Sequence, residues 1–388
     1  MAQRARPRAG TAAGVAIGAA VGYNIANVGP AAEVVSHAYG IRLGLVGLLT
    51  TALFVTHLIM QIPGGKLVDR HGARTLAGIA LAVIAAGNVV ALITASFPLG
   101  ILGRLIAGLG TGIGFIAGSD YVRATVGSAT AQGLYGASAV GGGGVALAVV
   151  PLAASAFGWR APYATALIVA CAVLPCLLLV PRDRRKGEAL RRSAAPIAEI
   201  ARDSRLYALA IAHTASFAFS VIIGNWTVSL LQDDGYGRQL GGAVAALTLL
   251  GGLVTRPLGG RALQQWGARA APLLALSMLC GAGGTVLLLL DAPLPVRIVG
   301  AAVLGLAAGV PFAAAFSGAQ AIRRDAPGAA IGFINTCATL VIAVGAPLVG
   351  VSFSFAGHGR AGFAVVALLW ALSAFAVLPS KLPRVATG

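Results

Sequence analysis

Long apolar runs, separated by short breaks of polar residues, glycine or proline, dominate the sequence. A helix that crosses a bilayer needs about 20 apolar residues, and the runs have this length. Six runs precede the polar segment 181–203 and six follow it. The pattern therefore predicts twelve membrane helices at 11–35, 41–63, 74–95, 98–119, 128–155, 160–180, 205–231, 238–263, 270–291, 295–319, 328–354 and 361–379.

The amino-acid composition also indicates a membrane protein. Of the 388 residues, 58% are hydrophobic and 10% are charged, and the mean hydropathy is +0.88. A soluble domain has roughly 25% charged residues. The net charge of +17 would suggest a nucleic-acid partner in a soluble protein. Here it is better explained by loop arginines that face an anionic membrane surface, so we expect a lipid bilayer and no nucleic acid as partner.

One motif occurs twice, at the same place in each half of the chain. The segments 64–74 and 259–269 both read Gly-Gly, a basic residue, five further residues and Gly-Ala-Arg. We therefore expect two six-helix bundles, 1–180 and 205–388, joined by a cytoplasmic linker at 181–204. The predicted fold is an all-α membrane protein whose bundles are pseudo-symmetric, and duplicated bundles of this kind occur in secondary transporters.

The distribution of Lys and Arg predicts the orientation. With the N-terminus inside, 22 of the 28 basic residues lie in the termini, the linker and the inner loops. We therefore expect a multi-pass protein of the cytoplasmic membrane with both termini in the cytoplasm. The remaining basic residues lie outside or within a span, and they are Arg42, Arg104, Arg160, Arg238, Arg297 and Arg360.

The first copy of the repeated motif carries a family resemblance. The segment 65–74 reads GKLVDRHGAR and resembles G-x-L-x-D-R-x-G-x-R, the loop signature of the major facilitator superfamily. The segment 104–110, RLIAGLG, is similar to the pattern of that superfamily's fourth helix. The resemblance implies a carrier that works by alternating access, with a gating loop formed by Gly65, Asp69, Arg70, Gly72, Arg74 and Arg123.

Two departures from the family pattern limit what the resemblance implies. Gln264 stands where the first copy has Asp69, so a charge-based role is in doubt for the second half. The fifth span lacks the Gly-Pro pair of drug antiporters, which disfavours drug/proton antiport. Asp69 itself either pairs with a neighbouring arginine in one conformation only, which would bias the conformational equilibrium, or forms a permanent surface ion pair of little consequence.

Titratable side chains at membrane depth are few. Arg104 lies inside the fourth span, where a buried cation needs a cavity or a partner unless it snorkels to the interface. Arg297 lies nearer the end of its span, and we expect it to snorkel. Glu33, His57 and His213 are the groups that can change charge near neutral pH, so they are candidates for proton coupling. A histidine in a helix can equally be a hydrogen-bonded packing residue.

Polar side chains within apolar spans either contact substrate or join helices. The first and seventh spans line the central cavity in the family, so their polar residues rank above Asn335, Thr336 and Thr339 of the eleventh. The expected substrate-binding residues are Tyr23, Asn24, Asn27, Arg104, Asn225 and Trp226.

These patterns predict a secondary transporter of a small solute, coupled to a proton, working as a monomer. Because no catalytic or metal-binding set is visible in the sequence, we expect no enzyme activity, metal or cofactor. A passive channel remains an alternative. A second alternative is a nitrate/nitrite- or cyanate-like anion porter, in which an arginine lies midway along spans 2 and 8. Here Arg42 and Arg256 lie at the ends of the expected spans.

Overall fold

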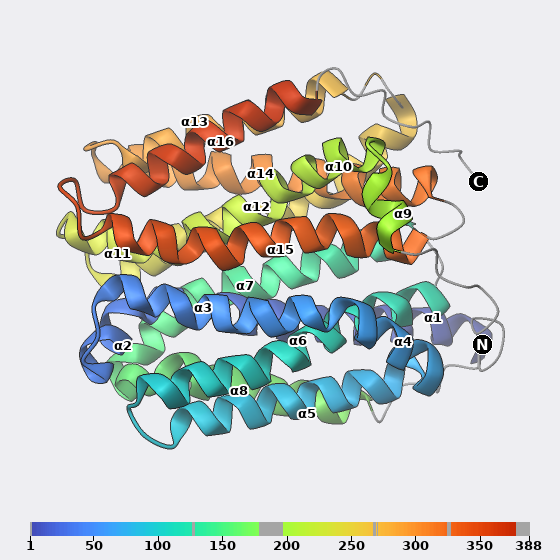
Figure 1. The fold of residues 1–388 in the computed structure, drawn as a ribbon, viewed down its shortest axis with the longest axis horizontal. Helices are drawn as coiled ribbons and strands as arrows, with labels where there is room; N and C mark the ends of the chain where they lie inside the picture. The colour runs from blue at the N-terminus through green and yellow to red at the C-terminus, as the bar shows by residue number, and fades with distance from the viewer. Residues whose placement is uncertain are drawn as a thin grey trace. The chain divides into compact units, whose positions relative to one another are not determined.

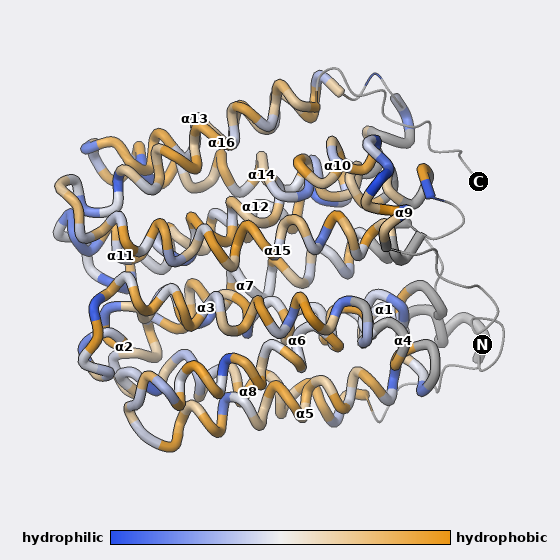
Figure 2. The backbone as a smooth tube through the Cα atoms, viewed as in Figure 1, coloured by the Kyte–Doolittle hydropathy of each residue, from blue (hydrophilic) through white to orange (hydrophobic). Residues whose placement is uncertain are grey.

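The computed structural model describes residues 2–125, 129–177, 197–266, 269, 271–323 and 327–377. These residues form two compact units, which meet in sequence between Ser193 and Ala194. Within each unit the long helices run along a common direction (Figure 1). Their middle parts are mostly hydrophobic, and hydrophilic residues gather toward the helix ends (Figure 2), as expected for helices that cross a bilayer.

The first unit begins with a helix that breaks at Gly29 and Pro30, where a short 3₁₀ turn follows. Proline cannot donate the hydrogen bond that would continue the α-helix, so the chain restarts as a second helix. The helices of this unit are α1 (Ala2–Ala26), α2 (Ala32–Tyr39), α3 (Leu43–Ile59), α4 (Gln61–His71), α5 (Ala73–Leu92), α6 (Phe97–Thr125), α7 (Ala129–Phe157) and α8 (Ala161–Cys176).

The second unit also has an interrupted first long helix. A six-residue π-helix, Thr214–Phe219, lies between α10 and α11. The helices of this unit are α9 (Ile197–Arg202), α10 (Arg205–His213), α11 (Ser220–Asp233), α12 (Arg238–Trp266), α13 (Ala271–Leu289), α14 (Leu294–Ile322), α15 (Pro327–Ser352) and α16 (Arg360–Val377).

Ten helical stretches of the described chain are long and apolar enough to cross a membrane. One of them, Gly133–Cys176, contains two helices, α7 and α8. The helix α3 is apolar but has only 17 residues. The all-helical membrane fold is confirmed, whereas the expected count of twelve spans differs from this count at these two places.

The repeated motif is not the loop that its sequence suggested. Residues 61–71 form the helix α4, and the chain turns only at Gly72, whose φ of +86° glycine adopts without strain. In the second unit α12 continues to Trp266, so most of the second copy is helical as well. The prediction of a loop rested on the charged residues of the motif. It was wrong because a helix that extends beyond the bilayer can be polar on all sides.

Corresponding helices pack in the same pairs in both units. In the first unit α6 packs against α3 and α5, and α5 also packs against α8. In the second unit α14 packs against α12 and α13, and α13 also packs against α16. The half-chain repeat seen in the sequence is thus a repeat of helix packing.

Glycine permits the closest of these contacts. A Cβ atom at Gly22 of α1 would overlap the backbone of Ala139 in α7, and one at Gly142 would overlap the backbone of Ala19. Gly108 likewise lets α6 approach α3 so closely that the Thr56 hydroxyl donates a hydrogen bond to the carbonyl of Leu105, at 2.7 Å. Small residues at helix interfaces allow this approach in membranes, where apolar burial alone gives little driving force.

The short helix α9 is held to the second unit by polar contacts. The Tyr207 hydroxyl donates a hydrogen bond to the Ala201 carbonyl at 2.8 Å, and Arg323 lies 3.8 Å from Glu199. Arg205 donates two side-chain hydrogen bonds to the Asp203 carboxylate, at 2.9 and 2.7 Å, and they lower the pKa of that carboxyl. The end of the predicted linker therefore belongs to the second unit.

Candidate functional site

Arg104 joins three helices in the interior of the first unit. Its side chain is 1% exposed, deep within α6. The Nη1 atom donates a hydrogen bond to Asn27 Oδ1 at 3.0 Å, and Nε donates to the Leu49 carbonyl of α3 at 3.3 Å. The Nη2 atom is buried and makes no hydrogen bond to a described residue. Arg104 is therefore fixed in place while it keeps donor capacity, and it does not snorkel.

The predicted asparagines at the end of the first helix, Asn24 in α1 and Asn27 just after it, extend this network. Asn27 Nδ2 donates to the Pro162 carbonyl of α8 at 2.7 Å, so Asn27 connects Arg104 to α8. Asn24 Oδ1 accepts a hydrogen bond from Asn88 Nδ2 of α5 at 2.8 Å. Sequence reasoning missed Asn88, although an amide within the apolar run 74–95 was a visible signal. Tyr23, also predicted, is buried in α1.

Two tyrosines that the sequence analysis did not select lie beside this network. The hydroxyl groups of Tyr39 in α2 and Tyr163 in α8 are 3.1 Å apart. Both phenol groups lie in the neighbourhood of the Arg104 guanidinium. A buried arginine surrounded by phenol and amide groups can bind an anion or a polar solute, because these groups offer hydrogen bonds without a fixed negative charge.

The first two candidates for proton coupling lie in different surroundings. Glu33 is half-buried in the first turn of α2, where the helix dipole favours a carboxylate. His57 is buried in α3, with Nδ1 3.0 Å from the Thr111 hydroxyl of α6 and with its ring beside Phe54 and Phe115. The structure describes no contact between these two groups.

His213, the third candidate, lies in an aromatic cluster of the second unit. Its Nε2 atom is 3.1 Å from Asn335 Oδ1 of α15. The imidazole stacks on Phe217 with ring centres 5.7 Å apart and also contacts Phe312 and Phe316 of α14, at 5.6 and 4.9 Å. These rings were missed in the sequence, although Phe312 and Phe316 have the spacing of neighbours on one helix face.

Arg256 lies near the end of the apolar part of α12, as expected, but it is 2% exposed, and its guanidinium lies 3.8 Å from the centre of the Phe312 ring. A cation over an aromatic face is attracted by the ring quadrupole. Because His213 contacts the same ring, Arg256 belongs to the surroundings of His213.

The two predicted residues of α11 differ in role. Trp226 Nε1 donates a hydrogen bond to the Ala346 carbonyl of α15 at 2.8 Å, and its ring packs against Phe353. These contacts hold α11 to α15. Asn225 is 3% exposed, and neither polar atom of its amide bonds to a described residue. Asn225 therefore keeps its capacity to contact a solute, whereas Trp226 uses its only donor for packing.

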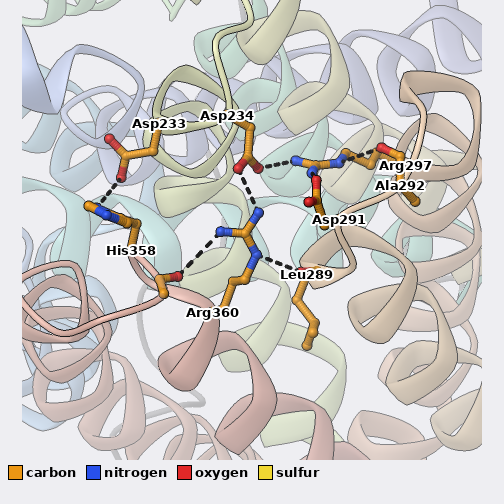
Figure 3. Close-up of polar contacts among 9 residues, drawn as sticks. Asp233, Asp234, Leu289, Asp291, Ala292, Arg297, His358 and Arg360 are labelled. Carbon is orange, nitrogen blue, oxygen red and sulfur yellow. Dashed lines mark hydrogen bonds and ion pairs between the residues drawn. The ribbon is translucent and has the colours of Figure 1, made fainter.

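A set of ion pairs joins the helix ends of the second unit (Figure 3). The Asp234 carboxylate, just beyond α11, pairs with Arg297 of α14 and, at 2.6 Å, with Arg360 of α16. Arg360 also donates a hydrogen bond to the Leu289 carbonyl of α13 at 3.1 Å, and Asp233 lies 4.0 Å from His358. Arg297 is 1% exposed, so the expectation that it snorkels is wrong. A carboxylate from the neighbouring loop compensates its charge instead.

The gating residues implied by the family resemblance are only partly described. Gly65, Asp69 and Arg70 lie in α4 and Arg123 lies in α6, but their side chains and surroundings are outside the described part of the structure. Gly72 forms the turn before α5, and Arg74 lies in the first turn of α5. The role of Asp69 stays a prediction.

Comparisons with known proteins agree on one family. The chain matches the family profile "Major Facilitator Superfamily" over residues 14–346. The chain is 37% identical over 75 residues to the "Uncharacterized MFS-type transporter YfiU" of Bacillus subtilis (strain 168). That match covers 19% of this chain and 14% of the relative.

A solved structure shares the fold along nearly the whole chain. The crystal structure of a point mutant of the nucleoside transporter NupG superimposes with a TM-score of 0.74 over 94% of this chain and 98% of its own. The sequence identity is 13%, so this likeness concerns the fold alone. Together with the family match, the multi-pass helical fold identifies the chain as a member of the major facilitator superfamily.

Proposed function

We propose that this protein is a secondary active transporter that moves a small solute across the cytoplasmic membrane by alternating access, coupled to a proton. Family membership supports the transporter class. A polar side chain buried at membrane depth is costly, which makes it a candidate for function. The observation that carries the proposal is the buried network of Arg104 and Asn27, in which Arg104 Nη2 keeps an unused donor.

The proposed substrate-contacting residues are Tyr23, Asn24, Asn27 and Arg104 of the first unit and Asn225 of the second. Trp226 supports this set by packing. Glu33, His57 and His213 are the proposed coupling groups, because a carrier driven by protons needs a group whose protonation differs between conformations. We propose that the protein works as a monomer, since each chain carries both bundles.

Uphill flux tests the transporter class. Purified protein in liposomes would receive a mixture of labelled organic solutes, with and without a pH gradient. We expect one solute to accumulate above its external concentration only when the gradient is present. A pH difference of about one unit supports about tenfold accumulation for one proton per solute. Flux that stops at equal concentrations under every gradient would identify a passive channel and contradict the proposal.

Replacing Asp69 by asparagine is expected to impair transport by about tenfold while expression and folding stay near normal, because a lost charge-assisted contact is worth about 1.5–3 kcal/mol. The reason is that a carboxylate which pairs in only one conformation biases the conformational equilibrium. Initial uptake rates, normalised to protein in the membrane, measure the effect. Gln264→Ala is the matched control in the second unit and should be far milder. Equal rates in Asp69→Asn and wild type would exclude the gating role.

The proposed orientation can be tested by cysteine labelling. In a variant without the four native cysteines, a membrane-impermeant maleimide applied from the cytoplasmic side should label a cysteine introduced at Ser193. It should not label one introduced at Gly359, in the loop before α16. The excess of Lys and Arg on the predicted inner side is the reason. The opposite labelling pattern would overturn the topology and place both termini outside.

A further inference from the structure

Among the buried polar atoms of the second unit that lack a hydrogen-bond partner in the described structure, three belong to His213 and to the helix α15 that contacts it. They are Nδ1 of His213, Nδ2 of Asn335 and Oγ1 of Thr339. His213 and Asn335 are 1% and 2% exposed, and Thr339 is fully buried. Asn335 and Thr339 are four residues apart in α15, so they lie on one face of that helix. Because buried polar groups are nearly always bonded, a group of such atoms points to a ligand that would bond them.

The backbone beside these atoms is irregular. The π-helix Thr214–Phe219 begins directly after His213 and carries Phe217, which stacks on the imidazole. The Ser216 hydroxyl donates a hydrogen bond to the Ala308 carbonyl of α14 and so fixes this segment. Single π-helical turns within α-helices are rare and frequently occur at functional sites. This irregularity is independent of the unbonded atoms, and it points to the same place.

The chemistry of the cluster defines the ligand. Arg256 and His213 contact the same ring, because the Arg256 guanidinium lies 3.8 Å from the centre of Phe312 and the imidazole centre lies 5.6 Å from it. Arginine stays protonated in proteins, so the cluster has a fixed positive charge that favours an anion. The Phe217 ring stacks on the imidazole, the rings of Phe312 and Phe316 stack on each other, and a flat apolar ring is the ligand shape that can join such a stack.

The hydrogen bond at Nε2 determines what His213 can do. The oxygen of Asn335 can only accept, so Nε2 carries a hydrogen and Nδ1 of the neutral ring is an acceptor. An acceptor repels a carboxylate oxygen. A proton taken up from water at Nδ1 turns that atom into a donor that can bind the carboxylate.

We infer that the cluster formed by His213, Phe217, Arg256, Phe312, Asn335 and Thr339 binds a small aromatic carboxylate together with one proton. The carboxylate is bound by Arg256, Asn335 Nδ2 and protonated His213, and its ring lies among the phenylalanines. The proton stays on His213, and no covalent bond forms. This inference rests on the proposed transport function, for which it names the substrate class and the coupling group of the second unit.

Calorimetry on the purified full-length protein tests this inference with benzoate as probe. Benzamide keeps the ring without the charge, and acetate keeps the charge without the ring. We expect saturable binding of benzoate, and binding at least about tenfold weaker for each of the other two, since loss of charged hydrogen bonds costs this much. Titrations at about pH 7.5 in two buffers of different ionisation enthalpy should show uptake of about one proton per benzoate.

Single substitutions test which residues bind benzoate and which residue takes up the proton. Arg256→Gln should weaken benzoate binding at least about tenfold, and Arg256→Lys should weaken it less. His213→Gln should abolish the proton uptake. The control Arg205→Gln removes an exposed arginine of the same unit and should bind benzoate as wild type does. Should Arg256→Gln fail to fold, Asn335→Leu replaces it and should show the same weakening. Thermal unfolding curves show which variants are folded.

Two results would overturn the inference: wild type that does not bind benzoate saturably, or folded Arg256→Gln and Asn335→Leu variants that bind it as wild type does. Different results would contradict the proposed transport function. If benzoate binds with proton uptake but no solute is moved in liposomes, the site stands and the transport proposal fails. If liposomes accumulate other solutes under a pH gradient and benzoate does not bind, the site alone is excluded.

Discussion

Replacing Arg104 by glutamine is expected to reduce transport by about 100-fold, since two charge-assisted hydrogen bonds of a buried guanidinium are lost. The Arg104 side chain joins Asn27, just after α1, to Leu49 of α3, so its loss also leaves their oxygen atoms without this donor. Arg104→Lys keeps the charge but cannot reproduce the planar fork that reaches both partners. We expect this variant to retain only a small part of the activity.

Initial uptake rates and thermal unfolding, both in the same preparations, measure the effect of these changes. Arg160→Gln is the control, since Arg160 is an exposed arginine of the same unit that stacks on Trp159. The control should transport at a near-normal rate. Arg104→Gln protein that is folded and transports as fast as Arg160→Gln would show that Arg104 is a packing residue only.

The second large effect concerns coupling. One of the variants Glu33→Gln, His57→Gln and His213→Gln is expected to lose accumulation driven by a pH gradient and to retain exchange of solute across the membrane. Accumulation needs a group whose protonation depends on the conformation, whereas exchange needs only a loaded carrier. His213 is the variant we favour, because its Nδ1 atom is buried and makes no hydrogen bond to a described residue.

Accumulation and counterflow are to be measured in the same liposomes for all three variants. With the gradient collapsed, the uncoupled variant should still exchange solute, because exchange needs only a loaded carrier. The exchange should be slower than in wild type where the replaced residue also contacts the solute, as we infer for His213. If all three variants accumulate solute as wild type does, these residues do not carry the coupling ion. Sodium coupling, solute exchange or facilitated diffusion would then be favoured.

Much of the fold could be predicted from the apolar runs. The hydrophobic period and length of a membrane helix are strong signals, and the half-chain repeat predicted two similar units. The prediction failed where a helix continues beyond the bilayer, at α4 and α12, because polarity there indicates water and not the end of the helix. The sequence analysis also missed the π-helix Thr214–Phe219, because a helix with one extra residue per turn has no distinctive amino-acid composition.

The candidate site was predictable only in part. Arg104 and Asn27 stood out because a polar residue in an apolar run is rare, and the structure brings them together. Asn88 has the same signal but was not selected. Arg256 was expected at the end of a span, and nothing in the sequence indicated that its guanidinium lies over the Phe312 ring. Arg297 was misjudged because its partner, Asp234, lies 63 residues away in sequence.

The glycine contacts between helices have a consequence for engineering this protein. Glycine-to-alanine changes within helices usually stabilise by about 0.5–1 kcal/mol each, and they are an obvious route to a more robust preparation. At Gly22 and Gly142 the added methyl group would separate α1 from α7, so these changes should destabilise. Gly78, Gly283 and Gly332 lie in helices with nothing within 4 Å of an added Cβ atom, so unfolding temperatures should rise when alanine is introduced there.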